Sequence, residues 1–102
     1  MPPPLRRARF DVAHVVVDGI GIPVKAAYLL LAQPENTDQL QWEVLAFALD
    51  QEPLARGTYP VDLTTLDGRE LHGDAVVVRS VDGAHVLRGA GPLDGVDAEE
   101  LT

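Results

Sequence analysis

The sequence contains no cysteine, and this absence excludes several classes of protein at once. A disulfide framework, thiolate metal ligands and thiol catalysis all require cysteine. With 102 residues, 46% of them apolar, the chain is long enough to bury a core without a disulfide or a metal. We therefore expect one globular domain that folds without a cofactor.

Long apolar runs are also missing. The longest run, AAYLLLA at 26–32, is far shorter than the roughly 20 residues that a membrane-spanning helix needs. The first ten residues, MPPPLRRARF, lack the apolar segment of a secretory signal. These two features predict a cytoplasmic protein that has no membrane partner.

Aromatic and basic residues are scarce. The chain has five aromatic residues, too few for the stacking platforms of proteins that bind single-stranded nucleic acid. After residue 9 it carries five basic and sixteen acidic residues, a net charge of −11 that repels phosphates and anionic membranes. We therefore expect no nucleic-acid partner. Seven arginines accompany one lysine, a bias that indicates GC-rich coding DNA and predicts a bacterial source.

The most frequent local pattern is the dipeptide Asp-Gly, which occurs at 18–19, 67–68, 82–83 and 94–95. Asp-Gly favours two-residue hairpin turns, because both of their central residues need positive φ. The stretches around the first three dipeptides are rich in apolar and β-branched residues, and they lie at 10–17, 57–66, 70–80 and 84–90. This pattern predicts a series of antiparallel hairpins.

Two further apolar stretches lie between these hairpins, at 22–32 and 41–50. The first fits a long strand. The second alternates like a strand, but it also groups Trp42, Leu45 and Leu49 on one side of a helix, and we favour the strand. Together the stretches predict an all-β fold, a small antiparallel β-barrel or sandwich of about six strands built from Asp-Gly hairpins.

The expected domain covers residues 10–96. We expect a flexible basic, proline-rich arm at 1–9 before it and an acidic tail at 97–102 after it. Within the domain, LARGTY at 54–59 resembles the tyrosine corner of Greek-key sandwiches, whose tyrosine hydroxyl bonds to the backbone upstream. Three predicted strands follow Tyr59, which does not fit an immunoglobulin-like domain, so we favour an inward-facing aromatic on a strand.

A candidate catalytic group lies in VRSVDGAHVLRG at 78–89, which contains Ser80, Asp82 and His85. A two-residue turn at 82–83 places Ser80 directly opposite His85, and it leaves Asp82 in the turn itself. A serine hydrolase also needs a buried orienting acid, an oxyanion hole and a concave substrate site. Because a hairpin tip is convex, we expect no catalytic residues here and favour a non-enzymatic protein.

A candidate ligand group lies in RELHGDA, where Glu70, His72 and Asp74 alternate along one face of a strand. These side chains are suited to a divalent metal, but the same face continues into Val76 and Val78, which we assign to the core. A bulge at Gly73 that turns the polar residues to water would resolve the conflict, and we favour it without a metal site. The alternative is a small-ligand-binding β-barrel, with or without a metal, whose polar mouth is formed by the three residues.

A candidate contact surface follows from the same pairing. Regular alternation places two arginines on the outer face of the 71–90 hairpin and several valines beside them. The predicted interface consists of Arg79, Arg88, Val77 and Val86, with Val76, Val78 and Leu87 on the core side. Arginine among apolar residues is typical of contact surfaces. We therefore favour an interaction or assembly module that binds a protein partner or forms homo-oligomers.

Overall fold

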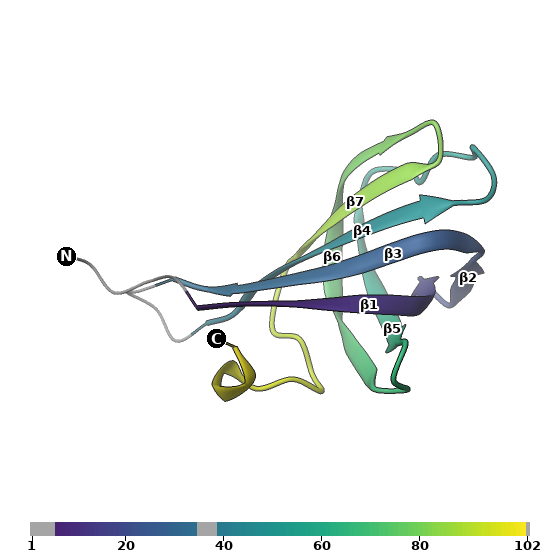
Figure 1. The fold of residues 1–102 in the computed structure, drawn as a ribbon. Helices are drawn as coiled ribbons and strands as arrows, with labels where there is room; N and C mark the ends of the chain where they lie inside the picture. The colour runs from purple at the N-terminus through teal and green to yellow at the C-terminus, as the bar shows by residue number, and fades with distance from the viewer. Residues whose placement is uncertain (1–5, 35–38, 102) are drawn as a thin grey trace.

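The computed structural model describes residues 6–34 and 39–101, and in these residues the chain forms seven strands and one short 3₁₀ helix. The elements are β1 (Arg6–Val17), β2 (Ile20–Ile22), β3 (Val24–Gln33), β4 (Gln41–Ala48), β5 (Thr58–Thr65), β6 (Glu70–Val81), β7 (Ala84–Gly89) and η1 (Ala98–Glu100). Six strands form an antiparallel barrel in the order β1-β3-β4-β7-β6-β5, and β5 closes it by pairing with β1 (Figure 1). The predicted all-β fold is confirmed, and of the two predicted architectures the chain adopts the barrel.

The stretch at 41–50, for which we favoured a strand over a helix, contains β4. Its side chains alternate along the strand: Trp42 and Val44 are buried, whereas Leu45 and Phe47 point away from the interior. The strand prediction is confirmed, and the alternation gives β4 one face in the core and one apolar face outside.

Two of the Asp-Gly dipeptides occupy two-residue turns. Asp18 and Gly19 have φ values of 54° and 76°, and Asp82 and Gly83 have values of 52° and 82°. Positive φ at both central positions suits the right-handed twist of the flanking strands. The third dipeptide lies in the longer turn at 65–69, whereas the fourth connects no hairpin.

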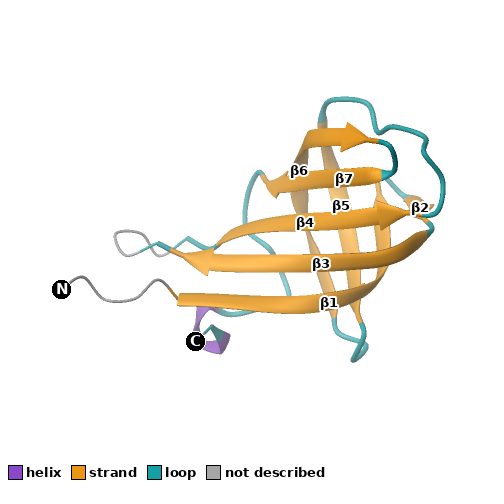
Figure 2. Ribbon diagram, turned by 45° about the horizontal axis from the view of Figure 1, so that its top comes forward, coloured by secondary structure: helices purple, strands orange, loops and turns teal. Residues whose placement is uncertain are grey.

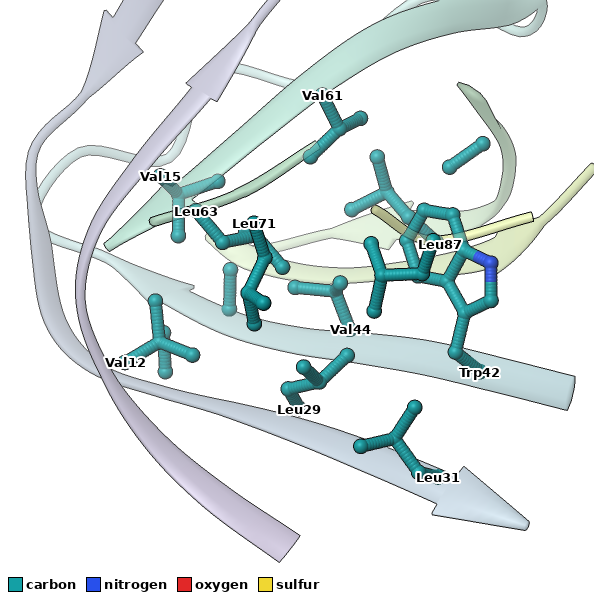
Figure 3. Close-up of a cluster of buried hydrophobic side chains, with 14 of the residues drawn as sticks. Val12, Val15, Leu29, Leu31, Trp42, Val44, Val61, Leu63, Leu71 and Leu87 are labelled. Carbon is teal, nitrogen blue, oxygen red and sulfur yellow. The ribbon is translucent and has the colours of Figure 1, made fainter. Parts of the chain in front are cut away.

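The barrel interior is a packed apolar core formed by inward-facing residues of all six barrel strands (Figure 3). Its largest member, Trp42, lies against two glycines, Gly89 of β7 and Gly73 of β6. A Cβ atom at Gly89 would lie 2.2 Å from Trp42 Nε1, and one at Gly73 would lie 2.9 Å from the indole ring. The indole N–H donates a 2.8 Å hydrogen bond to the carbonyl of Gly91. The glycines are therefore needed for space around the indole.

The N-terminal basic residues differ from the prediction. Residues 6–9, expected in a flexible arm, belong to β1 and pair with the end of β3. The first strand is longer than its apolar segment because β3 supplies hydrogen-bond partners as far as Arg6, which lies opposite Gln33. The remainder of the predicted arm, residues 1–5, lies outside the described residues.

The C-terminal segment also differs from the predicted acidic tail. Val96 and Leu101 are buried members of the core, on either side of η1. Arg69 connects this segment to the barrel. Its Nη1 lies 2.5 Å from Glu100 Oε1, and its guanidinium carbon lies 5.2 Å from the centre of the Phe10 ring of β1. The acidic residues are therefore the exposed side of a docked segment.

Strand β6 contains a bulge that the sequence analysis did not predict. Its pairing with β7 shifts between Val77 and Arg79, so that Val78 is an extra residue. Val77 lies opposite Leu87 and is only 6% exposed, whereas Val78 is 47% exposed. The prediction that Val77 faces outward and Val76 and Val78 face the core is wrong, because one inserted residue reverses every side chain beyond it.

Candidate functional site

Ser80 and His85 form a hydrogen-bonded pair at one end of the barrel. Ser80 Oγ lies 2.7 Å from His85 Nδ1, and it accepts a 2.7 Å hydrogen bond from the N–H of Leu54. The imidazole is 2% exposed, and this burial lowers the pKa of His85, although Asp50 acts in the opposite direction. With a neutral imidazole, the serine hydroxyl donates to Nδ1 and its oxygen accepts from Leu54. The pair thus joins the loop at 49–57 to the β6–β7 hairpin.

Glu70, His72 and Asp74 lie on the outside of the barrel wall, along the solvent-exposed face of β6. The predicted bulge at Gly73 is absent, since β5 and β6 pair in regular register from Thr58 to Thr64. No bulge is needed, because the same face continues outward through the valines at 76 and 78. The alternative placement at a barrel mouth is also wrong, since the interior side of β6 carries the core residues.

The structure brings Glu70 and His72 together with two aspartates in a shallow groove of about 480 Å³. His72 Nδ1 lies 2.6 Å from Asp62 Oδ1, and Asp94 lies on the other side of His72, joined by two backbone hydrogen bonds. Asp74 is not part of the groove lining. Among the described residues, no group of three or more histidine or carboxylate side chains is arranged to hold a metal ion. The groove is an acidic, open surface.

A larger apolar surface covers the outer side of β3, β4, β7 and β6, which lie side by side around the barrel (Figure 2). We call it the contact face. It consists of the outward residues Ala26, Tyr28 and Leu30 of β3, Glu43, Leu45 and Phe47 of β4, Ala84, Val86 and Arg88 of β7, and Val76, Val78, Arg79 and Val81 of β6. Most of these side chains are apolar, and several are largely exposed, including Phe47 at 39% and Val81 at 48%.

Strand register arranges the contact face in three rows that run across the four strands in the order β3, β4, β7, β6. The first is Leu30, Glu43, Arg88, Val76; the second is Tyr28, Leu45, Val86, Arg79; the third is Ala26, Phe47, Ala84, Val81. Residues of one row are direct cross-strand neighbours, so their side chains lie next to one another on the surface. Each row therefore presents a defined sequence of chemical groups.

The contact face carries three charged side chains, those of Glu43, Arg79 and Arg88. None of the ion pairs between described residues involves Glu43, Arg79 or Arg88. At the edge of the face, Arg9 lies 4.4 Å from the centre of the Tyr28 ring, and Tyr28 meets Phe47 edge to face at 6.3 Å. The face thus combines charged side chains, two aromatic rings and aliphatic side chains.

The structure agrees only in part with the predicted interface. Arg79, Arg88 and Val86 point outward as expected, whereas Val77 belongs to the core. The sequence analysis missed the contributions of β3 and β4, although the alternation in 41–50 already placed Leu45 and Phe47 together. That these strands continue the surface depends on β4 pairing with β7, which is distant in the sequence.

No protein-family model, curated protein or solved structure matches this chain. Within the described residues, no helix has the length and apolar character needed to cross a membrane. The function is therefore argued from the geometry of the contact face and of the groove.

Proposed function

We propose that this protein is a non-enzymatic interaction module that assembles into homo-oligomers through the contact face. The observation that carries this proposal is a largely apolar surface on a chain whose net charge is −8. The surface includes Arg79 and Arg88, which form no ion pair with another described residue. Removing apolar surface from water contributes about 25 cal/mol per Å², and exposed apolar patches of this kind mark contact sites. Arginine is enriched where protein partners meet.

The alternative prediction, a small-ligand-binding barrel, has weaker support. The inward side chains form a packed apolar core, which leaves the polar residues Glu70 and His72 on an open outer groove. Ligand sites are usually concave and bury most of the ligand. The contact face has in addition the mixture of arginine, aromatic and aliphatic groups that such a groove lacks.

The proposal predicts that reversing both arginines abolishes self-association. In the variant Arg79→Glu/Arg88→Glu, two carboxylates replace the only basic groups of the three rows on an already acidic molecule, and like charges then face each other in the oligomer. Light scattering should give a mass above 11.0 kDa for the wild type, rising with concentration, and the monomer mass for the variant.

Lys25→Glu/Arg56→Glu is the matched control, because both side chains are exposed outside the contact face and the change in net charge is the same. At about 0.15 M salt, where repulsion between the acidic bodies is largely screened, the control should keep the mass of the wild type. Circular dichroism should show a β-rich fold in all three proteins. A monomeric wild type, or an unchanged mass in the contact-face variant, would contradict the proposal.

A further inference from the structure

We infer that the occupant of the contact face is a second copy of this chain, related to the first by a two-fold axis that runs parallel to β4 and β7 and between them. The inference rests on the proposed function and adds its partner and geometry. Symmetric pairing of one surface with itself is the commonest form of homo-oligomer. An axis in this position places β4 of one copy over β7 of the other, and β3 over β6.

The central strands are complementary under this operation. Because Glu43 and Arg88 are cross-strand neighbours, the axis places each Glu43 over Arg88 of the second copy. In the next row Leu45 meets Val86, which joins two aliphatic side chains. In the third row the large Phe47 meets the small Ala84. One operation thus matches acid with base, aliphatic with aliphatic, and large with small.

The outer strands are complementary in the same sense. Tyr28 of one copy lies over Arg79 of the other, and a guanidinium over an aromatic ring is a favourable contact. Leu30 lies over Val76, and the third row brings Ala26 to Val81. A barrel wall curves away from its neighbour, so contacts at the outer strands need long side chains. Tyrosine and arginine are long enough to meet across that gap.

The positions of the charges also favour this axis over a two-fold axis perpendicular to the strands. An axis perpendicular to the strands, through the row of Leu45, would place Glu43 over Phe47 of the second copy and Arg88 over Ala84. Both charges would then be removed from water without gaining an opposite charge from the second copy, which is less favourable than the pairing that the parallel axis gives. The parallel axis removes the same surface from water and pairs both charges.

The arrangement predicts a charge-exchange effect between variants at positions 43 and 88. In a dimer of Glu43→Arg, the arginine at position 43 of each copy faces Arg88 of the other copy. In a dimer of Arg88→Glu, the glutamate at position 88 of each copy faces Glu43 of the other. In an equimolar mixture, one Glu43→Arg chain can pair with one Arg88→Glu chain. In this heterodimer, position 43 of each chain faces a residue of opposite charge at position 88 of the other. By sedimentation, we expect each single variant to raise the dissociation constant of the dimer about tenfold or more. The mixture should return it to within about threefold of the wild-type value.

Native mass spectrometry would identify the restored species, because the two variants differ in mass and the heterodimer lies between the homodimers. The matched control replaces Glu43→Arg by Glu52→Arg, an exposed residue outside the contact face. Glu52→Arg should dimerise with itself as tightly as the wild type, whereas its heterodimer with Arg88→Glu should be no tighter than that of the wild type with Arg88→Glu. Circular dichroism and thermal melting would verify that each variant is folded.

The possible results distinguish failure of the proposed self-association from failure of the two-fold arrangement. A wild type that stays monomeric overturns the proposed function and this inference with it. Self-association that is abolished by Arg79→Glu/Arg88→Glu but not restored in the charge-exchange mixture overturns the two-fold arrangement alone. Single variants that associate as tightly as the wild type also overturn that arrangement.

Discussion

His85 shows how one residue can connect distant parts of the chain. Its ring lies in the barrel interior, and through Ser80 it connects the β6–β7 hairpin to the backbone of Leu54. A buried polar group costs stability unless it is hydrogen-bonded, and here one hydroxyl satisfies both the imidazole and a backbone N–H. Ser80 and His85 thus have a structural role that explains their proximity.

The burial of His85 predicts that stability depends on pH near neutrality. The pKa of His85 lies below its ordinary value of 6.5 because burial disfavours the charged imidazole. The unfolded chain therefore binds the proton more tightly than the folded chain does. Its contribution to stability is fully present above pH 6.5 and is lost as the pH falls below that value. Urea unfolding between pH 5.5 and 8 measures the slope.

The matched variants for this measurement are His85→Gln, which removes the titrating group, and His14→Gln, which removes an exposed histidine. The first should flatten the pH dependence relative to the wild type, even if it lowers stability at every pH. The second should leave the slope unchanged. A wild-type slope that persists in His85→Gln would show that other groups cause it.

At the scale of elements, two irregular segments determine which surfaces the barrel presents. Because of the bulge at Val78, Val76 and Val78 lie on the same outer side of β6 as Val81, which extends the contact face. The C-terminal segment covers another part of the barrel: Leu101 belongs to the core, and Glu100 forms an ion pair with Arg69. The pKa of Glu100 is lowered by the backbone N–H of Asp97 and by Arg69, so the carboxylate stays charged in this position.

Docking of the C-terminal segment predicts that Leu101 contributes to stability despite its place near the chain end. Leu101→Ala should lower the free energy of unfolding by about 2 kcal/mol, because it removes a buried leucine side chain. The control is Leu66→Ala, whose side chain is 69% exposed, and its effect should stay within about 0.5 kcal/mol. Urea denaturation measures both, and equal effects would show that the segment contributes little.

At the scale of the whole molecule, charge and apolar surface oppose each other. A net charge of −8 keeps copies apart in solution, whereas the contact face favours association. Arg79 and Arg88 place positive charge where two acidic bodies would meet, which reduces repulsion at that position. In the proposed oligomer, the balance of these two terms sets the concentration at which the protein assembles.

This balance predicts that moderate salt strengthens self-association. Raising ionic strength from about 0.01 to 0.15 M shortens the screening length from about 30 to 8 Å, which removes most repulsion between the acidic bodies. In the proposed dimer the Glu43–Arg88 contacts are partly buried, so salt screens them less. The dissociation constant from sedimentation should therefore fall, and it should fall more steeply in Lys25→Glu/Arg56→Glu, whose net charge is more negative. Weaker association of the wild type in salt would contradict this account.

The local sequence was sufficient to predict the strands and their antiparallel arrangement. Alternation of apolar residues along 41–50 and 70–80, with Asp-Gly turns between strands, is a short-range signal that each segment carries alone. Ser80 and His85 were predicted to be neighbours for the same reason, because a two-residue turn determines which residues lie opposite each other near it.

Tertiary structure alone decided the features that depend on contacts between distant segments. The bulge at Val78 reverses one valine face, and only packing against β7 reveals it. Gly73 and Gly89 must lack a side chain because the indole of Trp42, about 30 and 47 positions earlier in the sequence, occupies the space beside them. Tyr59, assigned to a strand, also donates a 3.0 Å hydrogen bond to the Ala55 carbonyl, as in a tyrosine corner.

The contact face likewise depends partly on local sequence and partly on tertiary structure. Its residues and their alternation are present in the sequence, but their assembly into three rows requires β3, β4, β7 and β6 to be neighbours in the closed barrel. Closure joins β1 to β5, and it follows from the burial of apolar side chains contributed by the whole chain. Local pattern therefore determines what each strand is, and packing of the common core determines which strands share a surface.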